Sequence, residues 1–448
     1  MKQPFICAAV AAICLAQGAY AVDLMGVYEL AQANDPQLRA AEQRLAAAGE
    51  IPTQARSVLL PSISASASRD IGGSRRYLEG TRTGSFDRDE ESYSIGFQQT
   101  IYDDSNYGRL DRGRAELTRA EATYLEAWQG FLFRVTERYF DVLTAQDSVR
   151  FARAEETALR RQFEQAEQRF EVGLAAVTDV HEARAVYDAA RARVILADNS
   201  LEDAREALRE TTGTWFENYA SLIEDVPLEG PDPAEVEEWV ELALEYNPSV
   251  MQERSQVDVA DAELRIARAG HFPTLGLSGG YSRVIDNEWV GEDPVTQEPV
   301  ASGTSRNLGW NVGLTLDVPL FQGFAVQSRR RQAGFELRAA DETLDQTRRS
   351  VVRQTETAYR SIVAGIQEVE ARRQALVSAE SALEATNAGF EVGTRTIVDV
   401  LQSEQRFFQA ERDYSQARHQ FILNQLRLRQ TAGLLEEDDL ARVNQLLR

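Results

Sequence analysis

The side chains best suited to catalysis are few and scattered in this sequence. The three histidines, His181, His271 and His419, lie far apart, and the only cysteines, Cys7 and Cys14, lie near the start of the chain. No Gly-x-Gly-x-x-Gly or P-loop pattern indicates a nucleotide site. Carboxylates are abundant, but on helices they mostly mark solvated faces. We therefore expect no catalytic residues, no metal site and no cofactor.

The charge of the chain limits its partners. Its 448 residues include 48 basic and 71 acidic side chains, which gives a net charge of −23. A nucleic-acid binder needs a basic surface to neutralise phosphates, so we expect no nucleic-acid partner. The hydrophobic fraction of 43% is too high for a disordered acidic chain.

The first 21 residues have the pattern of a secretory signal peptide. Lys2 precedes an apolar run from Phe5 to Ala16, and Ala19-Tyr20-Ala21 is a typical cleavage site. The alternative, a membrane anchor, is disfavoured because the run is short. Later segments lack the apolar length of a membrane helix, so residence in a membrane would be peripheral or through β-strands.

The remaining chain contains one pattern written twice. Asp35-Pro36 is matched by Asn247-Pro248, and Phe170-Glu171-Val172-Gly173 is matched by Phe390-Glu391-Val392-Gly393. A direct repeat in this order indicates two structural repeats of the same plan. We place them at residues 22–226 and 227–448.

Proline spacing predicts very long helices. No proline occurs between Pro61 and Pro227 or after Pro319, and proline is what most strongly breaks a helix interior. We expect one long helix in each repeat, roughly Asp104 to Phe170 and Phe324 to Phe390, each about 100 Å long.

Two β-hairpins are predicted ahead of these helices. In each repeat, Asp35-Pro36 or Asn247-Pro248 should begin a helix that ends near Pro61 or Pro273. Two short segments of alternating apolar residues follow, separated by a loop rich in Gly, Asp, Ser and Thr. The alternating residues are Ile63, Ala65 and Ala67; Tyr93, Ile95 and Phe97; Leu275, Leu277, Gly279 and Tyr281; and Leu308, Trp310, Val312, Leu314, Leu316, Val318 and Leu320.

A return helix with a heptad pattern follows each long helix. Large and small residues step by threes and fours, which predicts left-handed coiled-coil packing. The alternative is an ordinary amphipathic helix. It is disfavoured because ten consecutive positions keep the heptad spacing in both repeats. The two series are Val180, Ala183, Tyr187, Ala190, Val194, Ala197, Leu201, Ala204, Leu208 and Thr211; and Val400, Ser403, Phe407, Ala410, Tyr414, Ala417, Phe421, Asn424, Leu428 and Thr431.

A single chain cannot complete this structure in a membrane. Two hairpins make an open sheet with two unpaired edges, and lipid cannot satisfy those edges. Four strands are also too few for a barrel. If the hairpins enter a membrane, several copies must share one barrel, which indicates an oligomeric channel.

The turn regions resemble one known family. The segment from Val392 to Leu401 and its counterpart from Val172 to Val180 are similar to the helix tips of the TolC family of outer-membrane efflux and secretion channels. The resemblance implies a mainly α fold with a pair of strands in each hairpin, built as a homotrimer. Its coiled-coil helices would form a trimeric α-barrel, and its strands a shared 12-stranded outer-membrane β-barrel.

The same resemblance implies a function and partners. The protein would be the passive exit duct of a tripartite efflux pump or a type I secretion system, in the outer membrane of a Gram-negative bacterium and extending into the periplasm. Its partners would be a periplasmic adaptor (membrane fusion) protein, an inner-membrane pump of RND or ABC type, and outer-membrane lipid. The alternative from a different class is a soluble periplasmic coiled-coil scaffold or adaptor.

The resemblance also assigns a periplasmic gate. Arg395 would bond Thr178 and Asp179 of an adjacent chain, and the planar guanidinium fork suits such a pair of acceptors. A tyrosine of the family is replaced here by Phe390, so its hydroxyl link to Asp179 is lost.

A pore constriction is implied one turn further on. Asp399 matches a family aspartate, and Gln402 stands where a second acidic residue is expected. Residues three apart share a helix face, so both would point to the pore axis. Repulsion in a ring of aspartates would raise their pKa values. The alternative for Arg395 and Asp399 is a solvated ion pair of little consequence.

Adaptor docking is assigned to the exposed turns. The residues concerned are Val172, Gly173, Leu174, Val392, Gly393 and Thr394. The glycines permit the chain reversal. Trp310 and Tyr281 belong either to an aromatic girdle at a membrane surface or to packing against a neighbouring strand.

Overall fold

The computed structural model describes residues 21–292, 296, 299–301 and 304–448. The predicted signal peptide, residues 1–21, therefore falls outside the described residues except for its last one. The chain forms two compact units. One, the sheet unit, comprises Leu45–Ala120 and Glu253–Leu344. The other, the helical unit, comprises Glu121–Gln252, Asp345–Arg448 and the described part of Met1–Arg44. Each unit takes segments from both predicted repeats.

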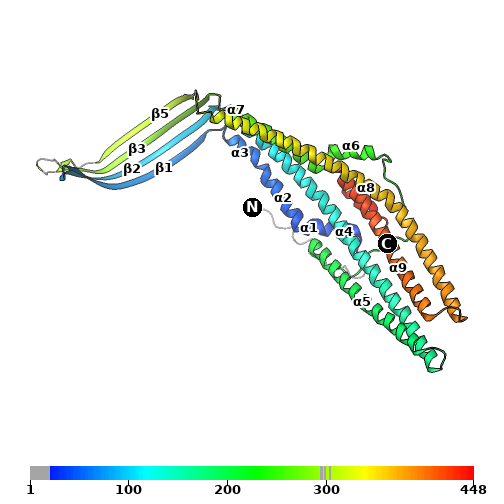
Figure 1. Ribbon diagram of the computed structural model, residues 1–448. Coiled ribbons are helices and arrows are strands. Elements are labelled where there is room, and N and C mark those ends of the chain that lie inside the picture. Colours follow the sequence, from blue (N-terminus) through cyan, green and yellow to red (C-terminus); the bar gives the residue numbers. More distant parts are fainter. Residues whose placement is uncertain (1–20, 293–295, 297–298, 302–303) are drawn as a thin grey trace, which may run out of the picture. The chain divides into compact units, whose positions relative to one another are not determined.

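The sheet unit contains one antiparallel sheet of long strands (Figure 1). The order is β1-β2-β3-β5, and the short β4 pairs with the far end of β3. Both predicted hairpins are confirmed. Strands β1, β2 and β3 are much longer than predicted, β5 begins and ends three residues earlier than predicted, and β4 was not predicted. The strands are β1 (Ser62–Leu78), β2 (Thr81–Tyr102), β3 (Thr274–Glu292), β4 (Pro299–Ala301) and β5 (Ser305–Asp317).

The predicted end of the last strand was wrong. Val318 and Leu320 continue the alternating pattern of β5, yet the strand ends at Asp317. Pro319 has no backbone N–H, so it cannot take part as a donor in the ladder.

The register gives the sheet two chemically different faces. On one, the apolar face, Ala65 lies opposite Ile95, which lies opposite Tyr281, which lies opposite Trp310. Trp310 is 79% exposed and Leu314 is 66% exposed in the single chain. The other face carries small or polar residues in the rows between. They are Ser64, Gly96, Gly280 and Asn311 in one row, and Ser66, Ser94, Ser282 and Gly309 in another. The single chain therefore exposes a large apolar surface of the kind that contacts lipid or another protein.

The helices begin at the predicted caps. The Asp35 carboxylate accepts the backbone N–H groups of Gln37 and Leu38, and the Asn247 side chain accepts those of Ser249 and Val250. The helices are α1 (Leu24–Asn34), α2 (Pro36–Gly49), α3 (Ile51–Ser57), α4 (Asp104–Glu171), α5 (Val177–Thr212), α6 (Val236–Tyr246), α7 (Pro248–Ala269), α8 (Ala325–Glu391), α9 (Ile397–Thr431) and α10 (Glu437–Asn444).

The two long helices, α4 and α8, agree with the prediction to within one residue at each end. The predicted single helix from Pro36 towards Pro61 was wrong, because the chain turns at Glu50 and starts α3. Pro52 in the first turn of α3 explains the break, since it cannot donate a helical hydrogen bond to α2. Among the described residues, no helix is both long and apolar enough to cross a membrane.

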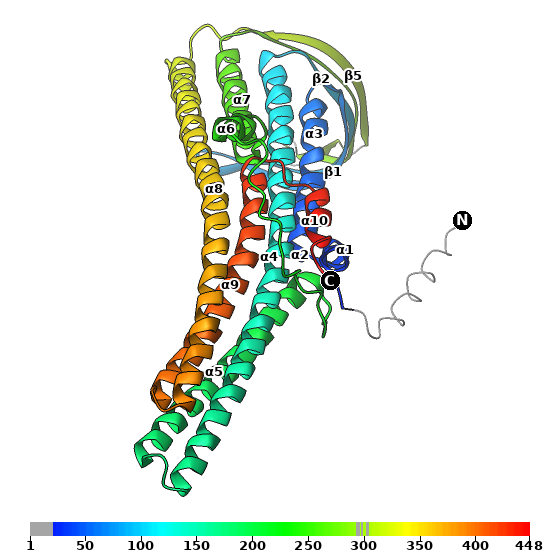
Figure 2. The same ribbon diagram turned by 90° about the vertical axis from the view of Figure 1, so that its right-hand side faces the viewer.

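The return helices α5 and α9 pack with their heptad positions inward. None of the ten predicted positions on either helix is exposed. Figures 1 and 2 show α5 running back along α4, and α9 along α8. Helix α9 is buried on more of its circumference than α5, and its enclosed residues include Glu404, Arg418 and His419.

His419 lies in the core of the helical unit. Its Nδ1 is 2.8 Å from the Thr144 hydroxyl, and its ring meets Phe140 edge-on. Burial lowers the pKa of His419 to about 4, and the charges of Arg418 and Arg150 act in the same direction against the opposing effect of Asp147. The imidazole is therefore neutral in the folded protein at neutral pH.

This burial predicts a loss of stability in acid. The folded pKa lies below the ordinary value of 6.5, so the stabilisation is present above pH 6.5 and declines as the pH falls towards 4, by about 3 kcal/mol. Denaturant unfolding followed by circular dichroism measures it. His419→Gln retains a hydrogen-bonding side chain without titrating there, and its stability should fall less. An identical pH dependence of the two proteins would contradict this assignment.

Candidate functional site

The two helix tips have the same turn geometry. Gly173 has φ +77° and Gly393 has φ +80°, both in the left-handed region that glycine adopts without strain. The Leu174 N–H donates to the Arg169 carbonyl at 2.7 Å, and the Thr394 N–H donates to the Gly389 carbonyl at 2.8 Å. These bonds satisfy the last carbonyls of α4 and α8 and turn the chain into α5 and α9.

The tips present apolar side chains to solvent. Val172 is 69% exposed, Leu174 is 72% exposed and Val392 is 76% exposed. The Thr394 hydroxyl points back to the Gly389 carbonyl at 3.0 Å. Exposed aliphatic side chains on a fixed turn suit contact with another protein.

The charge of Arg395 acts on Asp399 without a direct ion pair. Among the described residues, its exposed guanidinium makes no hydrogen bond and no ion pair. Thr178 is exposed, and the Asp179 carboxylate accepts only a weak contact from the Ala176 N–H at 3.4 Å. The three predicted gate residues are thus not joined within one protomer.

Asp399 has a local role that the sequence analysis missed. One of its oxygens accepts the Thr396 N–H at 2.9 Å and the Thr396 hydroxyl at 2.8 Å, and the Asp399 N–H donates to that hydroxyl oxygen. These bonds to Thr396, first the backbone and then the side chain, lower the pKa of Asp399, and the charge of Arg395 acts in the same direction. The Thr-x-x-Asp spacing is a capping-box signal and would have revealed it. Gln402 is exposed.

Phe390 takes a packing role in place of a hydroxyl link. Its ring packs against a buried cluster that joins α4, α5 and α9. The Arg169 guanidinium also lies over the ring, 4.7 Å from its centroid. A cation–π contact of this kind contributes about 0.5–1 kcal/mol at an exposed site. The cluster consists of Leu159, Ala166, Ala183, Ala190, Ile397 and Leu401.

A buried carboxylate ties three helices together farther from the tips. The side chain of Glu155 is only 2% exposed and accepts Arg193 of α5 at 2.7 Å and Arg412 of α9 at 3.1 Å. Near it, the Gln162 amide donates to Glu404 at 3.0 Å, and burial raises the pKa of Glu404. Sequence analysis missed this junction, because nothing local distinguishes Glu155 from the many solvated glutamates.

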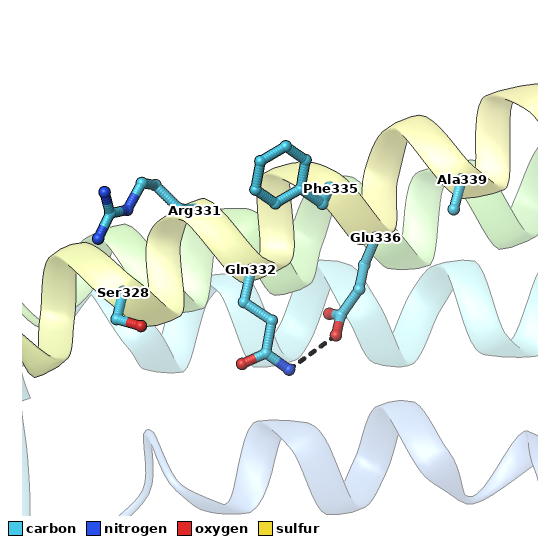
Figure 3. Close-up of a pocket in the computed structure, with 6 residues that line it drawn as sticks. All are labelled: Ser328, Arg331, Gln332, Phe335, Glu336 and Ala339. Carbon is cyan, nitrogen blue, oxygen red and sulfur yellow. Dashed lines mark hydrogen bonds between the residues drawn. The ribbon is translucent and has the colours of Figure 1, made fainter.

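A shallow groove of about 520 Å³ runs along one face of α8 (Figure 3). It is lined by a single helix, and its Gln332 amide donates to Glu336 at 2.9 Å. Phe335 rises beside them and is 62% exposed. Because the groove is open and is lined by one helix only, with its amide and carboxylate paired to each other, it has the character of a helix-packing surface.

Comparison with known proteins agrees with this fold. The family model described as "Outer membrane efflux protein" matches residues 27–214 and 239–434. The outer membrane protein TolC of Vibrio cholerae is 39% identical over 96% of this chain and 95% of its own length. The alkaline protease secretion protein AprF of Pseudomonas aeruginosa is 31% identical over 95% of this chain and 87% of its own length.

Solved structures show the same architecture. The outer membrane protein VceC of Vibrio cholerae superposes with a TM-score of 0.73, at 20% identity, over 92% of this chain and 96% of that one. CusC, described as forming a transmembrane channel, gives 0.74 at 17% identity over 94% and 95%. The predicted channel fold is confirmed.

These findings also decide between the two predicted functions. They support an exit duct in the outer membrane of a Gram-negative bacterium, and they do not support a soluble scaffold. The family is one of channels and transport proteins. The chain is an outer-membrane exit duct and belongs to the outer membrane efflux protein family.

Proposed function

We propose that the chain acts as a homotrimer in which three sheets close into one barrel. The observation that carries the proposal is the aligned apolar face of the sheet, with Trp310 and Leu314 largely exposed. Within the described part, β1 and β5 each pair along one side only. The free edge of β5 could therefore form hydrogen bonds with the free edge of β1 in a neighbouring copy. The exposed face of α8 around Phe335 suits helix packing between protomers.

We also propose that the chain consists of two structural repeats that follow a cleaved signal peptide. The order helix, hairpin, long helix, return helix occurs in residues 22–226 and again in 227–448, with β4 as an addition. The family model matches one stretch in each. Residues 1–21 would be removed on export.

The gate would be held by contacts between protomers. Arg395 lies in the turn just before α9, and its guanidinium makes no ion pair with the described residues. Thr178 and Asp179 have little local bonding on α5. A neighbouring protomer would bring these groups together, and the fork of the arginine would hold the carboxylate and the hydroxyl. Inside one protomer, the Arg169–Phe390 contact and the tip cluster keep the two helix pairs together.

The constriction would be a ring of Asp399 side chains with Gln402 beside it. Each Asp399 keeps one oxygen on Thr396, which lowers its pKa, whereas repulsion between three carboxylates would raise it. The capping bonds thus favour a charged ring at neutral pH, which would attract cations.

The tips would bind a periplasmic adaptor protein, and an inner-membrane pump of RND or ABC type would supply the transported substrate. The exposed side chains Val172, Leu174 and Val392 provide the apolar contact surface, and Gly173, Gly393 and Thr394 hold the turns in shape. Relatives named for efflux and for protease secretion support both kinds of cargo.

Breaking the gate contact should open the duct. In planar bilayers, Arg395→Ser should raise single-channel conductance severalfold, because the link between protomers is lost while the fold is kept. Arg406, another exposed arginine on α9, gives the matched control Arg406→Ser, which should leave conductance unchanged. Equal conductance of Arg395→Ser and the unmodified protein would contradict the gate assignment.

The buried ion pairs of Glu155 should contribute to the stability of the helical unit. Glu155→Gln removes the shared charge from Arg193 and Arg412, which are themselves partly exposed, and should destabilise the helical unit by about 2 kcal/mol. Hydrogen exchange of α4, α5 and α9 amides measures the loss. Glu156→Gln, at the next and half-buried residue of α4, is the control, because Glu156 makes no hydrogen bond or ion pair in the described part of the chain. Similar protection in both variants would show that the junction contributes nothing.

A further inference from the structure

A groove crosses the apolar face of the sheet and ends at a positive charge. Its volume is about 510 Å³. The small side chains of Ala65 and Ala67 form its floor, Tyr93 and Tyr281 border it, and Arg283 stands at its end. A mainly apolar surface groove with an arginine in its lining has the chemistry to take a hydrocarbon chain that carries an anionic head group.

Two arginines of this face have no partner. Arg283 on β3 and Arg306 on β5 occupy neighbouring rows of the apolar face, since Arg283 lies opposite Leu308 and Ile285 lies opposite Arg306. Both are exposed, and neither makes a hydrogen bond or an ion pair in the described part of the chain.

The paired arginine of this face is Arg69, which lies between two carboxylates of β2. Arg69 contacts Asp89 at 2.8 Å and Glu91 at 4.0 Å, and the Tyr93 hydroxyl donates to Glu91 at 3.3 Å. Arg69 is thus neutralised within its own sheet, whereas Arg283 and Arg306 are not.

Closure of the proposed barrel would not neutralise Arg306 either. The edge of β5 would then lie against β1 of the next protomer. The β1 residues on the apolar face up to Gly73 include no carboxylate. They are Ile63, Ala65, Ala67, Arg69, Ile71 and Gly73.

The arginines stand at the outer boundary of the apolar band. The chain enters and leaves the sheet at the end where Leu275 pairs with Leu316, and Arg283 pairs with Leu308 towards the hairpin turns. The intervening strand rises about 27 Å, which a barrel tilt reduces to about 20 Å, close to the height of an outer-membrane apolar band. Tyr281 and Trp310 lie in the row just before Arg283. The arginines therefore reach the level of the outer head groups.

We propose that this groove binds one acyl chain of a phosphorylated glycolipid of the outer leaflet, with Arg283 and Arg306 holding its phosphate. The inference rests on the proposed closed barrel, because only closure turns the apolar face towards lipid. Arginine is well matched to a phosphate, and two charge-assisted contacts would make the site selective over zwitterionic phospholipid.

The test is native mass spectrometry of the full-length protein in detergent, titrated with bisphosphorylated lipid A, dephosphorylated lipid A or phosphatidylethanolamine. The protein should retain bisphosphorylated lipid A at least tenfold more tightly than either other lipid. Arg283→Gln with Arg306→Gln should weaken that binding by about 30-fold. Arg69→Gln, on the same face but already paired, should change it less than threefold. Ala67→Phe fills the groove and should weaken binding of both forms of lipid A.

The outcomes separate this inference from the proposed function. Equal affinity for the phosphorylated and dephosphorylated lipids would overturn the site, even if the double variant failed to fold. Unchanged binding by a folded double variant would also overturn it. In either case a trimeric mass in the same spectra would leave the proposed assembly standing. A monomeric mass would instead remove the closed barrel, and with it the basis of the site.

Discussion

The unpaired edges of the sheet are the constraint on which the rest of the structure depends. Backbone N–H and C=O groups cannot remain unsatisfied in hydrocarbon, and β1 and β5 each leave one edge open in the single chain. The exposed apolar face reinforces the constraint, because it is stable only against lipid. The proposed closure by neighbouring copies would satisfy both conditions and would bring their helices into one assembly.

At the tips, the residues divide into those that finish the local fold and those that are left for a partner. Gly173, Gly393 and Thr396 complete turns and caps inside the chain. Arg395 and the apolar side chains of Val172 and Val392 are not used in this way. The proposed gate, built from these unused groups, would open without unfolding any helix, and the buried Glu155 junction would preserve the helix packing behind it.

The sequence allowed the main architecture to be predicted, because its signals are periodic and local. The long proline-free runs located α4 and α8, and the heptads of α5 and α9 identified their inward positions. The lengths of β1, β2 and β3 were underestimated, because beyond the apolar band the alternation gives way to polar residues that still pair. The break before α3 follows from Pro52, a local signal that was available.

Long-range contacts at the candidate site could not be predicted in the same way. Glu155 meets Arg193 and Arg412 only through the packing of three helices, and Phe390 meets Arg169 across two hairpins. No spacing within one segment specifies such contacts. The resemblance to known tips named Arg395 and Asp399, but the structure adds that one is unpaired and the other is capped.

The most direct test of the shared barrel is the native mass of the protein extracted from outer membranes, corrected for bound detergent. The chain has a mass of 50.0 kDa before any processing. This account predicts three times the mass of the processed chain. A monomeric mass for protein that retains its strands would contradict the closure of the sheet by neighbouring copies.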